Sequence, residues 1–202
     1  MRKTCAAVCS LILCLFVFGG CSLSYSGEET EDGRFFIGYS KVEKRAFVGM
    51  ITVEADENGA IITVPDEYKG FPLTTLGGEI GRGYPCPFAI TVDLPAEYNE
   101  YVQAQKTFSA SYAGFDETGD GWETIAVTVR LGVNVTKAQW VDGYASYTGI
   151  FKTLEDGTEI RDILYHAIMH FEVDEANKVF YADEGKLYFK SNSRLVEGID
   201  YE

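Results

Sequence analysis

The sequence predicts a mainly β protein with an antiparallel-rich sheet or sandwich as its core. The strongest evidence is the segment 125–135, in which every second residue is apolar: Ile125, Val127, Val129, Leu131, Val133 and Val135. This period of two is typical of a strand with one buried and one exposed face. Segments 34–41 and 46–54 are rich in aromatic and β-branched residues, and the polar stretch between them predicts a hairpin. We expect the strand at 125–135 to cross the centre of the sheet.

The first twenty residues have the layout of a secretory signal peptide. Basic residues precede an apolar run at 11–18, which is too short to span a bilayer comfortably, and small residues follow it. The sequence Phe18-Gly19-Gly20-Cys21 resembles the lipobox of bacterial lipoproteins. That resemblance implies cleavage before Cys21 and acylation of its thiol. The protein would then be extracytoplasmic and anchored to the bacterial cell membrane, or to the outer membrane if the host has one.

Composition limits the partners of the mature chain. Arg2 and Lys3 leave with the signal peptide, so 15 basic and 31 acidic residues remain and the formal charge is −16. This charge repels anionic lipid and excludes nucleic acid as a partner. No motif predicts a cofactor. Of the five cysteines only Cys21 and Cys86 remain after cleavage, so no intramolecular disulfide is expected. We interpret Cys86, in a proline-rich turn at 84–87, as a buried small side chain.

Residues 21–33 are polar and acidic, with almost no apolar side chains. We therefore expect a flexible tether at 21–33, which holds a single β-rich domain at 34–202 away from the membrane. Within that domain, Asn58-Gly59 favours a type I′ turn that returns the chain as a strand at 60–64.

The remaining elements follow from local composition and periodicity. We expect a turn at 140–143, after which 144–152 pairs with the central strand. The segment 163–173 fits both a strand face and a helical stripe, and we favour the strand because 174–178 then turns into a hairpin partner at 179–181. A short helix is expected at 97–106 and a further strand at 107–112.

Two segments resemble the surface leucine-rich repeats of the BspA type. In the first, ITVPDEYKGFPLTTLG at 62–77 has the short strand, the proline and the glycine turn of such a repeat, and 94–98 echoes 64–68. The second, at 171–197, carries the pattern V-D-x-x-N, an aromatic residue, an acidic residue with Gly185, and x-L-Y. The resemblance, over about 60–98 and 171–197, implies irregular leucine-rich-repeat-like flanks and a role in adhesion or protein binding.

Metal and phosphate sites are weakly indicated. Asp116, Thr118 and Asp120 fit the first half of an EF-hand-like calcium loop. The position that needs a bidentate Glu is Val127, so the full loop is absent and we expect an exposed acidic turn. His166 and His170 share a face in a strand or a helix, but no third ligand is evident. The glycines at 77–83 lack the spacing of a phosphate-binding loop.

Three functions remain open for the domain. The first is a membrane-anchored protein-binding or adhesion module, which the repeat resemblance favours. The second is carbohydrate or cell-wall binding, in which exposed aromatic rings stack on sugars; the candidates are Trp122, Trp140, Tyr144 and Tyr147. The third is a glycosidase-like enzyme that uses a carboxylate pair, although no pair is singled out among 31 acidic residues.

Overall fold

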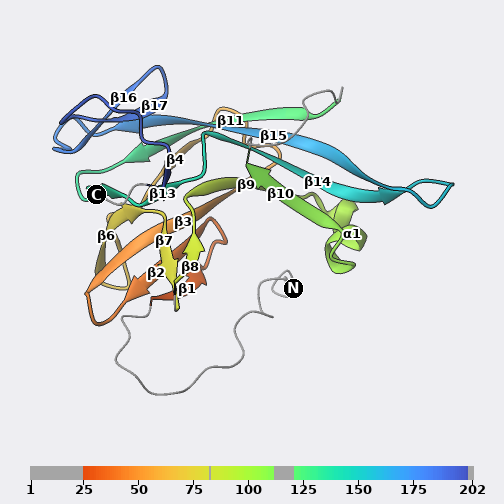
Figure 1. Cartoon of the computed structure of the whole chain (residues 1–202), viewed down its shortest axis with the longest axis horizontal. Coiled ribbons are helices and arrows are strands. Elements are labelled where there is room, and N and C mark those ends of the chain that lie inside the picture. The colour runs from red at the N-terminus through yellow and green to blue at the C-terminus, as the bar shows by residue number, and fades with distance from the viewer. Residues whose placement is uncertain (1–24, 82, 112–120, 200–202) are drawn as a thin grey trace.

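The computed structural model describes residues 25–81, 83–111 and 121–199, and these residues are mainly β (Figure 1). This confirms the prediction of a mainly β protein. Two curled sheets, each with parallel and antiparallel pairs, are joined by a 3-10 turn at Ala96–Tyr98 and the short helix α1 at Asn99–Gln103. The predicted signal peptide at 1–20, Cys21 and the calcium-loop residues Asp116, Thr118 and Asp120 lie outside the described residues.

Sheet A contains the first part of the folded chain. Its strand order is β1-β2-β3-β6-β12, with β5 paired to β6 and β9 to β3. The predicted hairpin at 34–54 is confirmed, because β2 and β3 pair antiparallel. The strand β3 then pairs in parallel with β6 through its first half and with β9 through its second half. The strands are β1 (Ser26–Glu29), β2 (Phe35–Ser40), β3 (Arg45–Glu54), β5 (Glu67–Tyr68), β6 (Phe71–Leu76), β9 (Ala89–Asp93) and β12 (Lys137–Ala138).

Sheet B has the order β10-β14-β15-β11-β4. Its longest strand, β15, pairs with β11 only from Tyr165 onward, and its first part pairs with β14 alone. As a result, the β14–β15 hairpin extends beyond the body as an arm (Figure 1). The strands are β4 (Ile61–Thr63), β10 (Thr107–Ser111), β11 (Glu123–Leu131), β14 (Ala145–Thr153) and β15 (Glu159–Val173).

Three two-stranded ribbons complete the described fold. The ribbon β7–β8 lies against sheet A, and β16–β17 lies beside the end of β15. The ribbons are β7 (Gly78–Ile80) with β8 (Tyr84–Cys86), β13 (Trp140–Val141) with β18 (Gly198–Ile199), and β16 (Phe180–Asp183) with β17 (Lys186–Phe189).

The main core lies between the two sheets. On β11, Ile125, Val127, Val129 and Leu131 are all buried, which confirms the alternation seen in the sequence. Val133 is exposed because the strand ends at Leu131. Polar contacts also join the sheets: the Ser146 hydroxyl on β14 donates to the carbonyl oxygen of Ile90 on β9 at 2.5 Å.

A second apolar cluster lies on the other face of sheet A, under the β7–β8 ribbon. Phe47 is 3% exposed yet does not belong to the main core. Glycines make room for these side chains: a Cβ at Gly38 or Gly78 would overlap the ring of Phe47, and one at Gly49 would overlap the Cys86 sulfur. Glycine is needed at these three positions because any side chain would collide with Phe47 or Cys86, and not because the backbone has a positive φ.

The structure corrects the predicted tether. Residues Ser26–Glu29 form β1 and pair with β2, so the prediction of a flexible segment through residue 33 is wrong for this stretch. The acidic side chains of β1 are tolerated in the sheet because β1 is an edge strand. The described fold therefore begins at Tyr25, not near residue 34.

Three expected strand pairings are also wrong. The segment at 60–64 forms β4, but it pairs with β11 of sheet B instead of returning along β3, and only Gly59 of the expected Asn-Gly turn has positive φ. The strand β14 pairs with β15 and β10, so the centre of sheet B is β15 and not β11. The segment at 174–178 does turn the chain, but β16 then pairs with β17. Only β4 has its true partner far away in sequence, whereas β14 and β16 each pair with the next strand along the chain.

Candidate functional site

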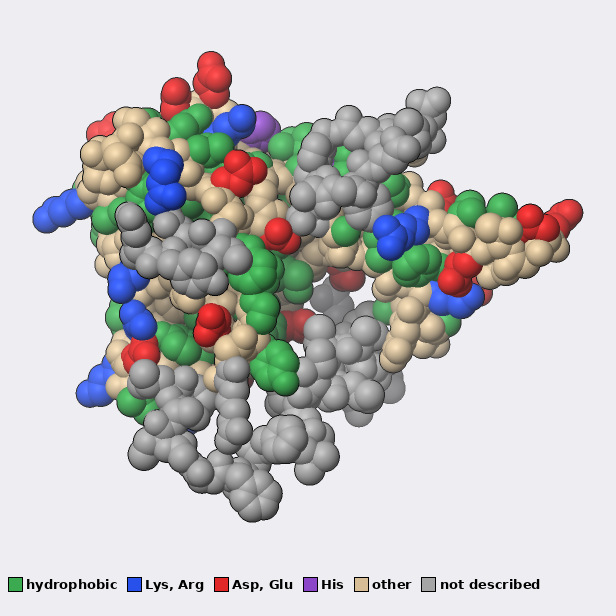
Figure 2. Space-filling model, in the orientation of Figure 1, with side chains coloured by type: hydrophobic (Ala, Val, Ile, Leu, Met, Phe, Trp, Pro, Cys, Tyr) green, Lys and Arg blue, Asp and Glu red, His purple; other side chains and the backbone are tan. Residues whose placement is uncertain are grey.

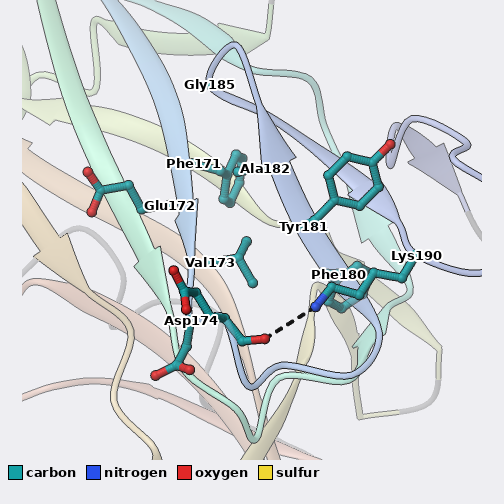
Figure 3. Close-up of a pocket in the computed structure, with 10 residues that line it drawn as sticks. Phe171, Glu172, Val173, Asp174, Phe180, Tyr181, Ala182, Gly185 and Lys190 are labelled. Carbon is teal, nitrogen blue, oxygen red and sulfur yellow. Dashed lines mark hydrogen bonds between the residues drawn. The ribbon is translucent and has the colours of Figure 1, made fainter.

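A groove of about 580 Å³ lies between the end of β15 and the β16–β17 ribbon (Figure 3). Phe171, Val173, Phe180 and Ala182 provide its apolar lining. The side chains of Glu172 and Asp174 lie on the β15 side, and Lys190 reaches in from the opposite side. Glu175 also lines the groove. The groove is therefore lined by apolar side chains and by charged groups of both signs.

Both ends of the groove are held by hydrogen bonds. At one end, the Phe171 amide donates to the carbonyl oxygen of Gly185 at the ribbon turn, at 2.8 Å. At the other end, Lys190 Nζ donates to the carbonyl oxygens of Asn177 (2.6 Å) and Glu175 (3.4 Å). The turn itself uses Glu184 and Gly185, both at positive φ, as a two-residue type I′ hairpin requires. These contacts within the protein hold the two walls of the groove in place, so the groove exists before a ligand binds.

The Asn177 side chain holds the segment beneath the groove. It is 1% exposed, and its amide nitrogen donates to the carbonyl oxygens of Gly132 and Val135, each at 2.9 Å. Its amide oxygen accepts from the backbone of Val179 and Phe180 at the same distance. The V-D-x-x-N pattern seen in the sequence thus ends at a residue whose side chain joins the β11–β12 loop to β16.

The groove is better suited to binding than to acid–base chemistry. Glu172, Asp174 and Glu175 are exposed. Glu172 is already paired with Arg130 of β11, whose Nη2 lies 2.7 Å from Oε2. Asp174 accepts the Ala176 amide at 2.8 Å within its own turn. Solvated carboxylates with these partners can accept hydrogen bonds from a ligand. They are not enclosed in a pocket that would shift their pKa values for general acid–base catalysis.

Of the four aromatic residues predicted to bind sugars, the structure brings together Trp122 and Tyr147. Tyr147 is 2% exposed and stacks on His166, with ring centroids 4.6 Å apart and an interplanar angle of 17°. Trp122 meets Tyr147 edge-on at 5.6 Å and 68°. This cluster packs β14 against β15 and is not a flat, exposed platform.

Trp140 and Tyr144 lie apart from that cluster. Trp140 is on β13, and its carbonyl oxygen accepts the Phe88 amide at 2.8 Å. The hydroxyl of Tyr144 donates to the carbonyl oxygen of Val196 at 2.6 Å and accepts the Leu187 amide at 3.3 Å. Burial raises the pKa of this hydroxyl above its ordinary value. Tyr144 thus ties the β16–β17 ribbon and the chain after it to the body.

The two histidines lie on the same face of β15, as expected, but in different surroundings. His166 is half-buried against Tyr147, whereas the exposed His170 lies over Gly185. Across the described ranges, no group of three His, Cys, Asp or Glu side chains has the arrangement of a metal site.

Cys86 lies on β8, not in the expected turn, and packs over Gly49. Burial raises the pKa of its thiol to about 11. At neutral pH the thiol is protonated, which disfavours a nucleophilic role.

Sequence reasoning missed the contacts at the start of the fold. The Tyr25 hydroxyl donates to Glu43 Oε2 at 2.6 Å and accepts from Arg45 Nε at 2.6 Å. Its ring lies 5.3 Å from that of Phe47. The one sequence signal was an aromatic residue inside an otherwise polar stretch. The groove was missed as well, because it arises from the packing of β16 and β17 against β15.

Within the part of the chain that the structure describes, no helix is both long enough and apolar enough to cross a bilayer. No family model, no curated protein and no solved structure matches the chain.

Proposed function

We propose that the protein is an extracytoplasmic lipoprotein, anchored through Cys21, that acts as a protein-binding or adhesion module. The anchor rests on the lipobox-like Phe18-Gly19-Gly20-Cys21 and on the signal-peptide layout before it. The observation that supports binding is the groove between β15 and the β16–β17 ribbon, whose ends are held by the Phe171–Gly185 backbone hydrogen bond and by the Lys190 side chain.

The groove suits an extended segment of another protein. Its lining includes apolar side chains such as Val173 and Ala182, and its carboxylates can meet the polar groups that flank an apolar side chain of the ligand. A preformed groove loses little conformational entropy on binding, because its walls are already ordered. Binding of this kind needs no cofactor.

We further propose that the two repeat-like segments are irregular leucine-rich-repeat-like flanks of the β core. A shared local geometry supports this. Lys69 and Gly70 form a positive-φ turn between β5 and β6, and Glu184 and Gly185 form the corresponding turn between β16 and β17. Each segment therefore contains a short hairpin with an Xaa-Gly turn.

A binding screen tests the proposed function. The full chain, purified in detergent, is applied to a panel of surface proteins and to a glycan array. We expect a protein ligand whose binding is lost in Ala182→Phe, which fills the groove, and is retained in Ala104→Phe, at an exposed position after α1. Binding to glycans alone favours the carbohydrate alternative. Binding to neither class, together with a measurable glycosidase activity, overturns the proposal.

A further inference from the structure

The folded chain starts at a fixed place on the surface. Tyr25 is held by hydrogen bonds to Glu43 and from Arg45, which lie in and after the turn between β2 and β3. The ring of Tyr25 also packs against Phe47. The entry of the chain and the β2–β3 turn (residues 41–44) are therefore side by side, at one end of sheet A.

The distance from this point to the proposed lipid is short. Three residues lie between Cys21 and Tyr25, and the four residue steps from one to the other span about 14 Å at most in a fully extended chain. An acylated Cys21 would lie near the headgroups, a layer about 5–8 Å thick on each side of the hydrocarbon. The body is therefore kept close to the bilayer, and the end of sheet A that carries Tyr25 must face it.

The β2–β3 turn presents an exposed apolar side chain between two cations. Val42 is 74% exposed, more than any other large apolar residue in the described structure. Lys41 and Lys44 on either side of it are exposed. Glu43 is engaged by Tyr25 and by Arg45, and so does not neutralise the two lysines.

The neighbouring turn between β5 and β6 adds no positive charge to this end of the sheet. Lys69 is paired with Glu28 of β1, and it lies 5.4 Å from the ring centres of both Tyr39 and Tyr68. Glu67 is exposed nearby. Within the β2–β3 turn itself, the positive charge thus comes from Lys41 and Lys44. Figure 2 shows Lys and Arg side chains at the left edge and lower left, the side on which the β2–β3 turn lies in Figure 1.

We propose that the β2–β3 turn contacts the membrane that carries the anchor, with Val42 at the interface and Lys41 and Lys44 at the phosphates of anionic lipids. This inference rests on the proposed acylation of Cys21. Two lysines and one valine are too few to hold a protein on a bilayer by themselves. A tether this short makes the contact intramolecular, and the high effective concentration compensates for the weak interaction. The net charge of the chain repels anionic lipid, so the contact is confined to this turn and orients the body.

Lysine footprinting on the mature acylated protein in vesicles tests this contact. The vesicles contain phosphatidylcholine with about one third phosphatidylglycerol, and acetylation of each lysine is measured by mass spectrometry. We expect Lys41 and Lys44 to react at least about threefold more slowly than the exposed Lys178 and Lys186, which serve as internal references. In vesicles of phosphatidylcholine alone, the difference should shrink.

A variant with Lys41→Gln, Val42→Ser and Lys44→Gln keeps Lys69 as a reporter at the same end of the sheet. Lys69 should be protected in the parent protein and lose that protection in the variant. In the matched control with Lys178→Gln and Lys186→Gln, the protection should persist. Near-ultraviolet circular dichroism establishes that both variants are folded.

The results of this experiment distinguish a failure of the turn contact from a failure of the proposed acylation of Cys21. If Cys21 is acylated and Lys41 and Lys44 react as fast as the reference lysines, the turn contact is wrong and the anchor stands. If Cys21 carries no acyl chain, the anchor is wrong, and the turn contact is wrong with it.

Discussion

The hydroxyl of Tyr25 donates a 2.6 Å hydrogen bond to Oε2 of Glu43, and this contact fixes where the chain enters the fold. Arg45 donates to the same hydroxyl, and so the three side chains form one small network. Through it, a residue four positions after Cys21 determines which end of sheet A is nearest the proposed anchor.

The first prediction concerns the pH dependence of this network. Burial, followed by the hydrogen bond to Glu43, raises the pKa of Tyr25 from 10.0 to about 12. Between these values the unfolded chain has lost a proton that the folded chain retains, so the free energy of unfolding falls as the pH rises from 10 to 12. Tyr25→Phe should reduce this fall. Urea denaturation at pH 9 and pH 11.5 measures it, and equal losses in both proteins would contradict the prediction.

The second prediction concerns the close approach of Gly38 to Phe47. A methyl group at Gly38 would overlap the Phe47 ring, so Gly38→Ala should lower the free energy of unfolding by about 1–3 kcal/mol. Phe47→Leu removes part of the ring and should be less harmful in the Gly38→Ala background than in the parent protein. Denaturation of all four proteins gives the coupling energy. Strict additivity of the two changes would rule out the predicted clash.

The third prediction concerns Asn177. Asn177→Ala leaves two carbonyl oxygens and two amides without their partner, so we expect a loss of about 2–4 kcal/mol in the free energy of unfolding. The exposed Asn192, which accepts only the Arg194 amide, provides the control. Asn192→Ala should change stability by about 0.5 kcal/mol or less. Similar costs at the two positions would show that the Asn177 network is not needed for stability.

The fourth prediction concerns the reactivity of Cys86. Because burial raises the pKa of its thiol from 9.0 to about 11, the thiolate fraction at pH 8 is about a hundredfold below that of an ordinary thiol. Alkylation of the mature protein by iodoacetamide should be correspondingly slow and should accelerate as the pH approaches 11. Peptide mapping by mass spectrometry measures the rate at Cys86. A rate equal to that of a free cysteine peptide would contradict the half-buried position of Cys86 over Gly49.

Local features of the fold were predictable from the sequence, whereas most long-range pairings were not. The alternation from Ile125 to Leu131 reports burial on one face, and it was correct for β11. It contains no information about which strand lies alongside, so the positions of β4 and β14 were missed. The β2–β3 hairpin was predictable because its two strands are neighbours in sequence. The hairpins β14–β15 and β16–β17 are equally local, but other partners were expected for their strands.

The candidate site was less predictable than the fold. An aromatic residue in the sequence can be a binding platform or part of the core, and burial decides between them: Tyr147 packs on His166 and is almost inaccessible. A single sequence also does not show that a glycine such as Gly38 makes room for an aromatic ring. The role of Tyr25 depends on Glu43 and Arg45, about twenty positions away, and only the folded sheet brings them together.

The N-terminus of the mature protein gives the most direct test of the proposed function. Mass spectrometry of protein isolated from membranes of the native host should find a chain that begins at Cys21 and carries fatty acyl groups. A chain that still begins at Met1 and has no acyl group would contradict the anchor, and with it both the proposed location and the membrane contact of the β2–β3 turn.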